Sequence, residues 1–440
     1  MQITDLCKKF YTAARRKAVE KALSTDISDN PPRFCSLSGS ARSMLLAGIA
    51  DSIPHAMLVI GHDREDADTL YHDMSRMLPD EAVAMFPSGY ARHIKYATPD
   101  PEAQIQRTET LNRYIADKSL KVIVSYPDAL AEKVMDKKEA DAQTFSIKSG
   151  TSIDPETLID WLNSHEFSRV DYVYEPGTYA RRGSIVDIFG FSHELPVRID
   201  FFGDEVDSIR TFSVETQLSE RKLDTAIISI NISRSGSSGI SLLEFIDKED
   251  IIAAPSLTEI LSDVRSTACD TTLSTSASAD IDTDTEALSQ LIDYDRFSRN
   301  FESRRRFEFT AATPDETKTV SVINFHCSPQ GTYNSNIQLF TDFFDRYVNA
   351  GYKAFILSDN ASQLSRLKEL IKDSDDIARF TPINQTLHEG FVDHTTKTCI
   401  FTDHQIYSRY HRCASTGSRA RAGRISLSLK ELKAIEPGDY

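Results

Sequence analysis

The sequence is poor in cysteine, and its cysteines have no pattern typical of a disulfide scaffold. Six are scattered along 440 residues, at Cys7, Cys35, Cys269, Cys327, Cys399 and Cys413. No two have the CxxC spacing of redox or zinc sites, and the amino terminus lacks the hydrophobic core of a secretion signal. We therefore expect reduced thiols in a cytoplasmic protein.

Long apolar runs and positive charge are also lacking. No run approaches the roughly 18 apolar residues of a membrane-spanning helix, so we expect no membrane partner. The chain carries 50 lysines and arginines against 66 aspartates and glutamates, a formal net charge of −16. Because phosphate contacts need clustered positive side chains, this balance argues against a stand-alone nucleic-acid-binding protein.

What the sequence does contain is an α/β rhythm, over a length that suits roughly three domains. Apolar runs at 56–60 and 121–125 predict buried strands, and the spacing of apolar residues at 63–77 predicts a helix between them. The alternation returns after residue 217, and a third α/β unit begins near residue 320, with a helix at 340–350 and strands at 352–357 and 398–402. This pattern is typical of parallel sheets covered by helices on both faces.

Residues 169–217 interrupt that rhythm with short runs of Val, Ile, Tyr and Phe between turn residues. Such runs predict consecutive antiparallel strands. Val197, Ile199 and Phe201 alternate with charged residues, as in a strand with one solvent-facing side. We therefore expect a small β-rich domain inserted in an α/β chain.

Residues 36–43, with the sequence SLSGSARS, lie where a phosphate loop would lie, before a predicted helix. A working loop has the pattern GxxxxGK[ST]. Here serine replaces the first glycine, Ala41 replaces the second, and Arg42 replaces the lysine. Within the degenerate stretch Gly39, Ser40, Ala41, Arg42 and Ser43, only Gly39 and Ser43 fit. We expect a degenerate loop that holds no cofactor; an unrelated polar turn before a helix is the alternative.

Three further stretches suggest no chemistry. Histidines and cysteines gather at 388–413 without zinc spacing, so we favour packing or surface roles. Three arginines at 304–306 predict a solvated helix end rather than a nucleic-acid contact. At 266–285, 17 of 20 residues are Ser, Thr, Ala or Asp, which predicts a flexible or frayed connection. We find no catalytic triad and no metal site.

The arginines of the β-rich stretch are different. If the turn at 176–177 joins two strands as a hairpin, Arg169 and Arg182 lie side by side. Two like charges held together would suit an anionic partner. The alternative is that each arginine pairs with Asp171, Glu175 or Asp187 inside the domain.

Several motifs resemble one protein family. EPGTYARRGSIVDIF (175–189) and LPVRIDFFGDEVDSIRTFSVETQ (195–217) are similar to the module shared by the excision-repair protein UvrB and the Mfd family of transcription-repair coupling factors. SGSARS (38–43), LHEGFVDHTTKTCIFTDHQIYSRYHR (387–412) and KELKAIEPGDY (430–440) resemble coupling factors rather than UvrB.

The resemblance implies an arrangement of domains. Residues 1–132 and 219–320 would form a split, degenerate helicase-like α/β domain, with a β-rich docking domain at 133–218 inserted between its halves. A second small α/β domain would span 325–414. Residues 415–440 would form a basic linker and the opening of an RNA-polymerase-binding domain.

The resemblance also implies a partner surface and a lost nucleotide site. In the family the inserted domain docks UvrA, and Arg169, Arg182 and Phe189 match positions of that surface; Arg181 is carried over only as a neighbour. By approximate register, Ser256 and Leu257 stand where UvrB has the acidic pair that holds Mg²⁺.

The expected function is therefore a non-catalytic module that recruits UvrA to RNA polymerase stalled at DNA damage. Polymerase binding and ATP-driven translocation on double-stranded DNA would belong to domains beyond this sequence. The alternative is a UvrB-type, ATP-dependent helicase that recognises DNA damage.

Overall fold

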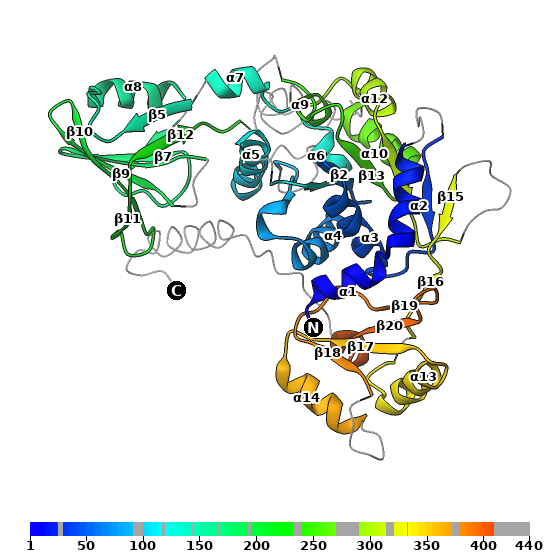
Figure 1. Cartoon of the computed structure of the whole chain (residues 1–440). Helices are drawn as coiled ribbons and strands as arrows, with labels where there is room; N and C mark the ends of the chain where they lie inside the picture. The colour runs from blue at the N-terminus through cyan, green and yellow to red at the C-terminus, as the bar shows by residue number, and fades with distance from the viewer. Residues whose placement is uncertain are drawn as a thin grey trace, which may run out of the picture.

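A computed structural model describes residues 1–24, 30–90, 100–116, 119–142, 144–165, 167–191, 195–232, 239–269, 290–313, 321–331, 333–371 and 379–408. The chain forms a central α/β unit, an inserted β unit on one side and a small α/β unit below it (Figure 1). No helix in the described ranges is long and apolar enough to cross a membrane.

The central unit is built on a seven-stranded sheet in which every paired strand runs parallel to its neighbour. In spatial order its strands are β15 (Val322–Asn324), β1 (Arg33–Cys35), β14 (Arg306–Phe309), β13 (Ile251–Ala254), β2 (Met57–Ile60), β4 (Val122–Ser125) and β3 (Val83–Met85). The predicted parallel sheet is confirmed, and it draws strands from both sides of the insertion.

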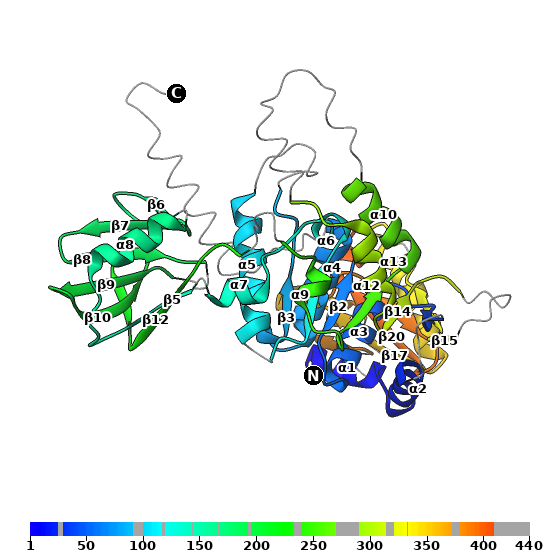
Figure 2. The ribbon, with the colours of Figure 1, turned by 90° about the horizontal axis from the view of Figure 1, so that it is seen from above.

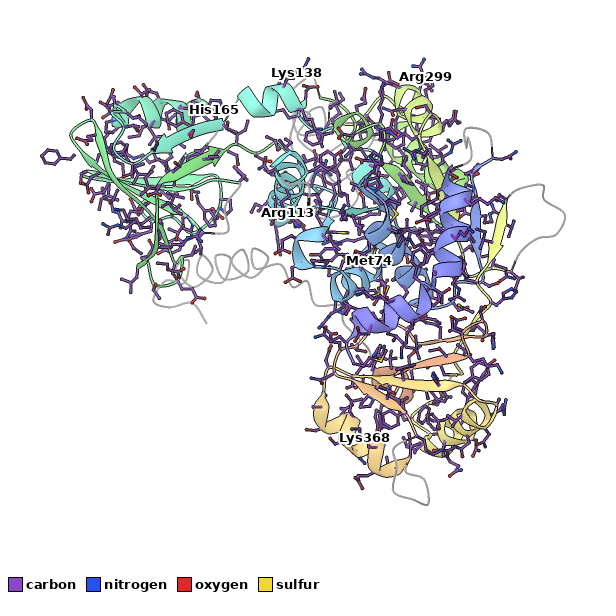
Figure 3. All side chains as sticks on the ribbon, in the orientation of Figure 1. Met74, Arg113, Lys138, His165, Arg299 and Lys368 are labelled. Atoms are coloured by element: carbon purple, nitrogen blue, oxygen red, sulfur yellow. The ribbon has the colours of Figure 1, made fainter. Side chains whose placement is uncertain are left out.

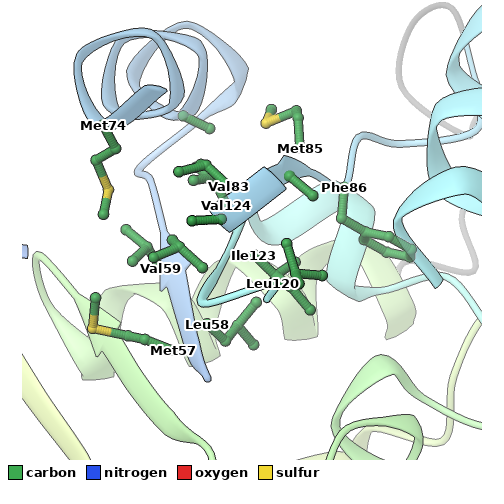
Figure 4. Packing of buried hydrophobic residues seen from close by; sticks show 14 of the residues in the cluster. Met57, Leu58, Val59, Met74, Val83, Met85, Phe86, Leu120, Ile123 and Val124 are labelled. Carbon is green, nitrogen blue, oxygen red and sulfur yellow. The ribbon is translucent and has the colours of Figure 1, made fainter. Parts of the chain in front are cut away.

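Helices cover this sheet. They are α1 (Ile3–Phe10), α2 (Ala13–Ser24), α3 (Ala41–Ser52), α4 (Arg64–Met77), the 3-10 helix η1 (Asp80–Ala82), α5 (Pro101–Ala116), α6 (Pro127–Leu130), α7 (Lys137–Ala142), α9 (Leu242–Phe245), α10 (Leu257–Cys269) and α12 (Tyr294–Glu302). The α4 helix begins where the sequence predicts, because the Asp63 carboxylate accepts a hydrogen bond from the Asp66 amide. Met74 then packs toward Val59 and Val124 of the sheet (Figure 4).

The inserted unit is a six-stranded sheet with one helix. In spatial order the strands are β11 (Ser219–Leu223), β10 (Glu205–Phe212), β9 (Val197–Phe202), β8 (Ile185–Phe189), β7 (Thr178–Arg182) and β6 (Ser168–Arg169), and the helix is α8 (Pro155–Ser164). Strands β7 to β11 are antiparallel, as predicted. Val197, Ile199 and Phe201 are buried, which confirms the predicted alternation along β9.

A two-stranded ribbon joins the insertion to the rest of the chain. It pairs β5 (Thr144–Lys148) with β12 (Thr225–Ser229) in antiparallel fashion. The strand pairing of the inserted unit therefore continues past residue 218, since β12 returns beside β5. Seen from above, the inserted unit stands to one side of the seven-stranded sheet (Figure 2).

The small unit contains a five-stranded sheet. Its spatial order is β16 (Cys327–Pro329), β19 (Phe391–Asp393), β20 (Thr398–Thr402), β17 (Lys353–Leu357) and β18 (Thr381–Ile383), with α13 (Ile337–Asn349), α14 (Ala361–Leu370) and α15 (Asp403–Ile406). The strands predicted near 352–357 and 398–402 are confirmed as neighbouring parallel strands.

The small unit shares a hydrophobic core with the central unit. Phe325, Phe355, Leu387 and Phe391 belong to the same buried cluster as the seven-stranded sheet. The Phe10 ring of α1 makes an edge contact with Phe391, with 5.5 Å between ring centroids. The other face of the five-stranded sheet has a separate core, built around Phe340, Phe344 and Phe401 and their neighbours.

Two expectations for non-sheet segments have different outcomes. Of residues 266–285, the first four continue helix α10 to Cys269, and the rest lie outside the described residues. The arginines at 304–306 are not a solvated helix end. Arg304 is only 4% exposed and donates to the Leu243 carbonyl within α9 and to the Ile246 and Asp247 carbonyls just after it, so it is a structural cap.

Candidate partner-binding surface and degenerate phosphate loop

The six-stranded sheet of the inserted unit has two unlike faces. Helix α8 covers one of them, where the Tyr179 hydroxyl donates to the Asn163 side chain over 2.7 Å. We call the opposite side the outer face. Because side chains alternate along a strand, Ala180 and Arg182 of β7 lie on it, while Tyr179 and Arg181 point toward α8.

A buried carboxylate organises charge on the outer face. Asp187 is 0% exposed, and it accepts two hydrogen bonds from Arg198, over 2.7 and 2.9 Å. Its second oxygen also accepts from Arg182. One carboxylate thus binds two guanidinium groups. The hydrogen bonding between Arg198 and Asp187 raises the pKa of Arg198.

Aromatic rings fix the same two arginines. The Arg182 guanidinium lies 5.1 Å from the centre of the Tyr172 ring, and that of Arg198 lies 4.4 Å from Phe212. The Arg182 side chain is nevertheless 38% exposed. A planar cation that is anchored on one side and open to solvent on the other is suited to binding a carboxylate.

The positive charge extends across the sheet. The register aligns Asp187, Arg198, Arg210 and Lys222 in one row over β8 to β11. Arg210 and Lys222 are exposed. The chain is acidic as a whole, so this row with Arg182 forms a local cationic surface on the outer face.

Arg169 is exposed, but it does not stand beside Arg182. Strand β6 runs parallel to β7, not antiparallel, and its register pairs Arg169 with Tyr179. The predicted side-by-side hairpin arrangement is therefore wrong. Arg182 lies three residues further along β7, about 10 Å away, and on the opposite face. The two arginines flank the β6 edge of the sheet.

Arg181 belongs to the other face. It forms an ion pair with Glu156 of α8, and its side chain is 31% exposed. Its place next to Tyr179 puts it on the same side as Arg169. The structure thus brings Arg169 and Arg181, rather than Arg169 and Arg182, to one side of the sheet.

Phe189 does not lie on the surface. It is 2% exposed and packs with Val173, Ala180, Phe212 and Val214 in a small core under the outer face. A partner cannot contact this ring without opening that core, so its role as a contact residue is corrected to one of support. Sequence pattern alone could not separate the two, because β8 is buried along most of its length.

Phe202 is a further exposed residue of the outer face, and it is absent from the residues predicted from the sequence. It is 82% exposed at the end of β9, where Gly203 (φ 63°) and Asp204 form the turn to β10. Its position after the alternating Val197, Ile199 and Phe201 would have placed it on the solvent side. Figure 3 shows the side chains over this unit, with His165 labelled beside α8.

The degenerate phosphate loop has the predicted place in the fold. Residues 36–40 connect strand β1, inside the parallel sheet, to the amino terminus of α3. This is the strand–loop–helix context of a phosphate-binding loop. An unrelated polar turn would not require that context, so the structure favours the first interpretation.

Two side chains of this loop at the positions that would contact a nucleotide are turned into the protein. Arg42, which stands at the lysine position, forms an ion pair with Asp66 of α4. Ser43 is fully buried. At the carboxyl end of β13, the Leu257 amide donates to the buried Glu308 carboxylate over 3.0 Å, and Glu308 also pairs with Arg33.

The histidine and cysteine cluster is divided by the fold. Cys399 is buried in β20, and burial raises its pKa to about 12. A ring nitrogen of His404 lies 2.6 Å from the His388 carbonyl oxygen, and His394 contacts Ser328 and Tyr352. Residues 411 and 413 of that cluster lie outside the described residues.

Comparison with known proteins finds a match for the inserted unit. Residues 145–231 match the family described as the UvrB interaction domain. The inserted unit is therefore similar to that domain family. The match spans the β5–β12 ribbon and the sheet between its strands, so it includes the whole outer face.

Relatives of known function match a longer stretch. The chain is 32% identical over 197 residues to the transcription-repair-coupling factor of Bacillus subtilis (strain 168), which covers 44% of this chain and 16% of that protein. It is 29% identical over 181 residues to the same factor of Escherichia coli (strain K12), covering 41% and 16%. It is 29% identical over 184 residues to the UvrABC system protein B of Enterococcus faecalis, covering 39% and 28%.

These matches confirm the resemblance to an amino-terminal, UvrB-like region of transcription-repair coupling factors. The matched segment spans only about a sixth of the coupling factors, 16% of each. Activities and partners of the longer proteins are therefore considered separately below.

Proposed function

We propose that this chain recruits UvrA in transcription-coupled DNA repair, through the inserted unit. The observation that carries the proposal is the pose of Arg182, which a buried carboxylate and an aromatic ring hold at the surface of a UvrB interaction domain. Arg169 extends the contact surface around the β6 edge. Phe189 supports this surface from below.

Charge supports a partner with an acidic contact surface. The chain carries a formal net charge of −16, yet Arg182, Arg198, Arg210 and Lys222 gather on one side of one sheet. Complementary charge raises the association rate and fixes register between proteins. Phe202, exposed at the edge of the same surface, adds an apolar anchor of the kind enriched in interfaces.

We further propose that the chain itself catalyses no reaction. The residues at the phosphate loop support this, because Arg42 is engaged by Asp66 and no acidic pair follows β13. Residues 1–132 and 219–320 then serve as a helicase-like frame, and 133–218 as the docking domain. The small domain at 325–414 completes the module.

In the longer parent protein, we propose a cytoplasmic, ATP-driven translocase on double-stranded DNA that displaces stalled RNA polymerase. Polymerase binding would follow the linker at 415–440. These activities rest on the similarity to coupling factors, not on any site in this chain.

A calorimetric titration of the chain with purified UvrA tests the proposal. We expect saturable binding that weakens as salt rises, because charge pairs at the rim are screened. No detectable heat at micromolar concentrations would contradict it. A parallel titration with a fluorescent ATP analogue tests the alternative of a UvrB-type helicase, which requires saturable binding.

A further inference from the structure

Residues 385–390, between β18 and β19 of the small unit, lie directly against the phosphate loop. The Glu389 amide donates to the Ser40 hydroxyl over 3.0 Å, and the Ser40 amide donates to the Glu389 carbonyl over 3.2 Å. A Cβ atom on Gly39 would meet the Gly390 carbonyl oxygen at 2.7 Å. The two loops therefore touch backbone to backbone.

This contact lies at the amino terminus of α3, which is where a working loop of this type binds a phosphate. In a working loop, backbone amides at the start of the helix surround the phosphate oxygens. Here protein carbonyl oxygens, the negative ends of peptide dipoles, lie at the amino terminus of α3. We propose that residues 385–390 are an intramolecular plug that replaces nucleotide phosphates, which makes the small unit a resident part of the central unit.

Three further amides of the loop and the helix start also donate to protein acceptors. The Ser36 amide donates to the Ala312 carbonyl over 2.9 Å, and the Leu37 amide to Thr310 over 3.0 Å. The Ala41 amide donates to the Ser38 carbonyl over 3.2 Å. A phosphate would have to displace protein acceptors from the same donors, so restoring the consensus side chains alone would not restore binding.

Hydrogen bonds to the rest of the protein fix the position of the plug. The His388 amide donates to the fully buried Asp73 carboxylate of α4 over 2.8 Å. The Gly390 amide donates to the Gln405 side chain over 2.7 Å. A Cβ on Gly390 would lie 2.2 Å from the Ile400 carbonyl oxygen, so only glycine fits there.

An ion pair clamps the small unit in place. Arg15 of α2 donates to both oxygens of Asp393 in β19, over 2.7 and 2.8 Å. Arg15 is 9% exposed and Asp393 1% exposed. The guanidinium also lies over the Phe10 and Phe325 rings, at 4.5 and 5.2 Å. Removing Arg15 would leave the buried Asp393 carboxylate without its cation, with only the hydrogen bonds from Thr395 and Thr396 among the described residues.

Hydrogen exchange on the whole chain tests the plug, and it does so independently of UvrA binding. The amides of Ser40, His388 and Glu389 should exchange slowly in the wild type and should open together. Arg15→Ala should speed exchange at all three by at least about 100-fold, since a broken buried pair is strongly destabilising. Arg16→Ala is the matched control, because the neighbouring Arg16 pairs with Glu20 on an exposed surface.

A less disruptive variant provides a second test of the plug in case the Arg15→Ala protein does not fold. Ser40→Ala removes only the acceptor of the Glu389 amide, so exchange there should rise about five- to tenfold. Exchange at β20 should stay unchanged.

Millimolar Mg-ATP or inorganic phosphate should leave all three amides unaffected. The proposal is overturned if either ligand slows exchange at Ser40 with saturation. It is also overturned if the wild-type Ser40 and Glu389 amides exchange as fast as those of an exposed loop.

Discussion

The carboxylate of Asp187 is fully buried and still accepts a hydrogen bond from Arg182, whose side chain is more than one third exposed. The pair connects the interior of the inserted unit to its outer face. Arg182 is thereby held in one orientation before a partner arrives. Preorganisation of this kind lowers the entropic cost of binding.

Asp187→Asn should therefore weaken UvrA binding less than a change at Arg182 itself, because the cation stays and only its orientation is lost. We expect an unfolding free energy lower by about 1–3 kcal/mol, typical of a lost bond to a charged group. Calorimetry and denaturant unfolding measure the two effects. Asp200→Asn is the control, because Asp200 accepts from Ser184 on the same face and pairs with no arginine among the described residues. Equal effects of both substitutions would contradict the role of Asp187.

The two phenylalanines of this unit should behave in opposite ways. Phe189→Ala should lower the unfolding free energy by about 3–5 kcal/mol, because it empties a packed core. Phe202→Ala should change it by less than about 0.5 kcal/mol, since the ring is 82% exposed, but should weaken UvrA binding. Urea unfolding followed by titration separates these outcomes. A stable Phe189→Ala protein with lost binding would return Phe189 to the contact surface.

Histidine protonation should weaken the joint between the central and small units. Burial lowers the pKa of His72 from its usual value near 6.5. Asp73 and Arg76 of α4 face this ring, as do Asp359 and His388 of the small unit. Below pH 6.5 the unfolded chain takes up a proton that the folded chain does not, so the unfolding free energy falls as pH falls.

His72→Gln should flatten that decline between pH 7 and 5.5, by up to about 1.4 kcal/mol per pH unit. Urea unfolding at a series of pH values measures it. At pH 8 the two proteins should differ only by a constant packing term. Identical slopes for variant and wild type would refute the assignment to His72.

Thiol reactivity should follow burial. Burial raises the pKa of Cys7 and of Cys399 to about 12, so at pH 8 only about one thiol in 10,000 is ionised. Among the five cysteines that the structure describes, Cys269, at the exposed end of α10, should be alkylated first. Mass spectrometry of peptides after brief iodoacetamide treatment measures the extent of alkylation at each cysteine. Labelling of Cys7 before Cys269 would mean that α1 opens readily.

The spacing of apolar residues predicted the strands and helices whose formation depends on local sequence alone. The strand at 57–60 and the helix at 64–77 follow from apolar spacing and from the Asp63 cap. The alternation along β9 predicted which side chains are buried. The placement of Arg304 could not be predicted, since its acceptors are carbonyls about 60 residues earlier in the chain.

At the candidate surface, the direction in which β6 pairs with β7 could not be predicted from the sequence. A turn at 176–177 favours a hairpin, but strand β6 has only two residues and pairs in parallel. The register that separates Arg169 from Arg182 depends on tertiary packing, which local sequence does not encode. The contact between the plug and the phosphate loop could not be predicted either, because Ser40 and Glu389 lie 349 residues apart in the sequence.

UvrA binding by charge-reversed variants tests the central claim most directly. Arg169→Glu combined with Arg182→Glu should abolish binding in a calorimetric titration while leaving the fold intact by circular dichroism. The single changes should add, because the two side chains are about 10 Å apart and share no partner. Arg299→Glu with Arg366→Glu is the matched control, since both residues are exposed and lie on other units. The account predicts lost binding for the first pair and unchanged binding for the second; micromolar or tighter binding by the first pair would contradict it.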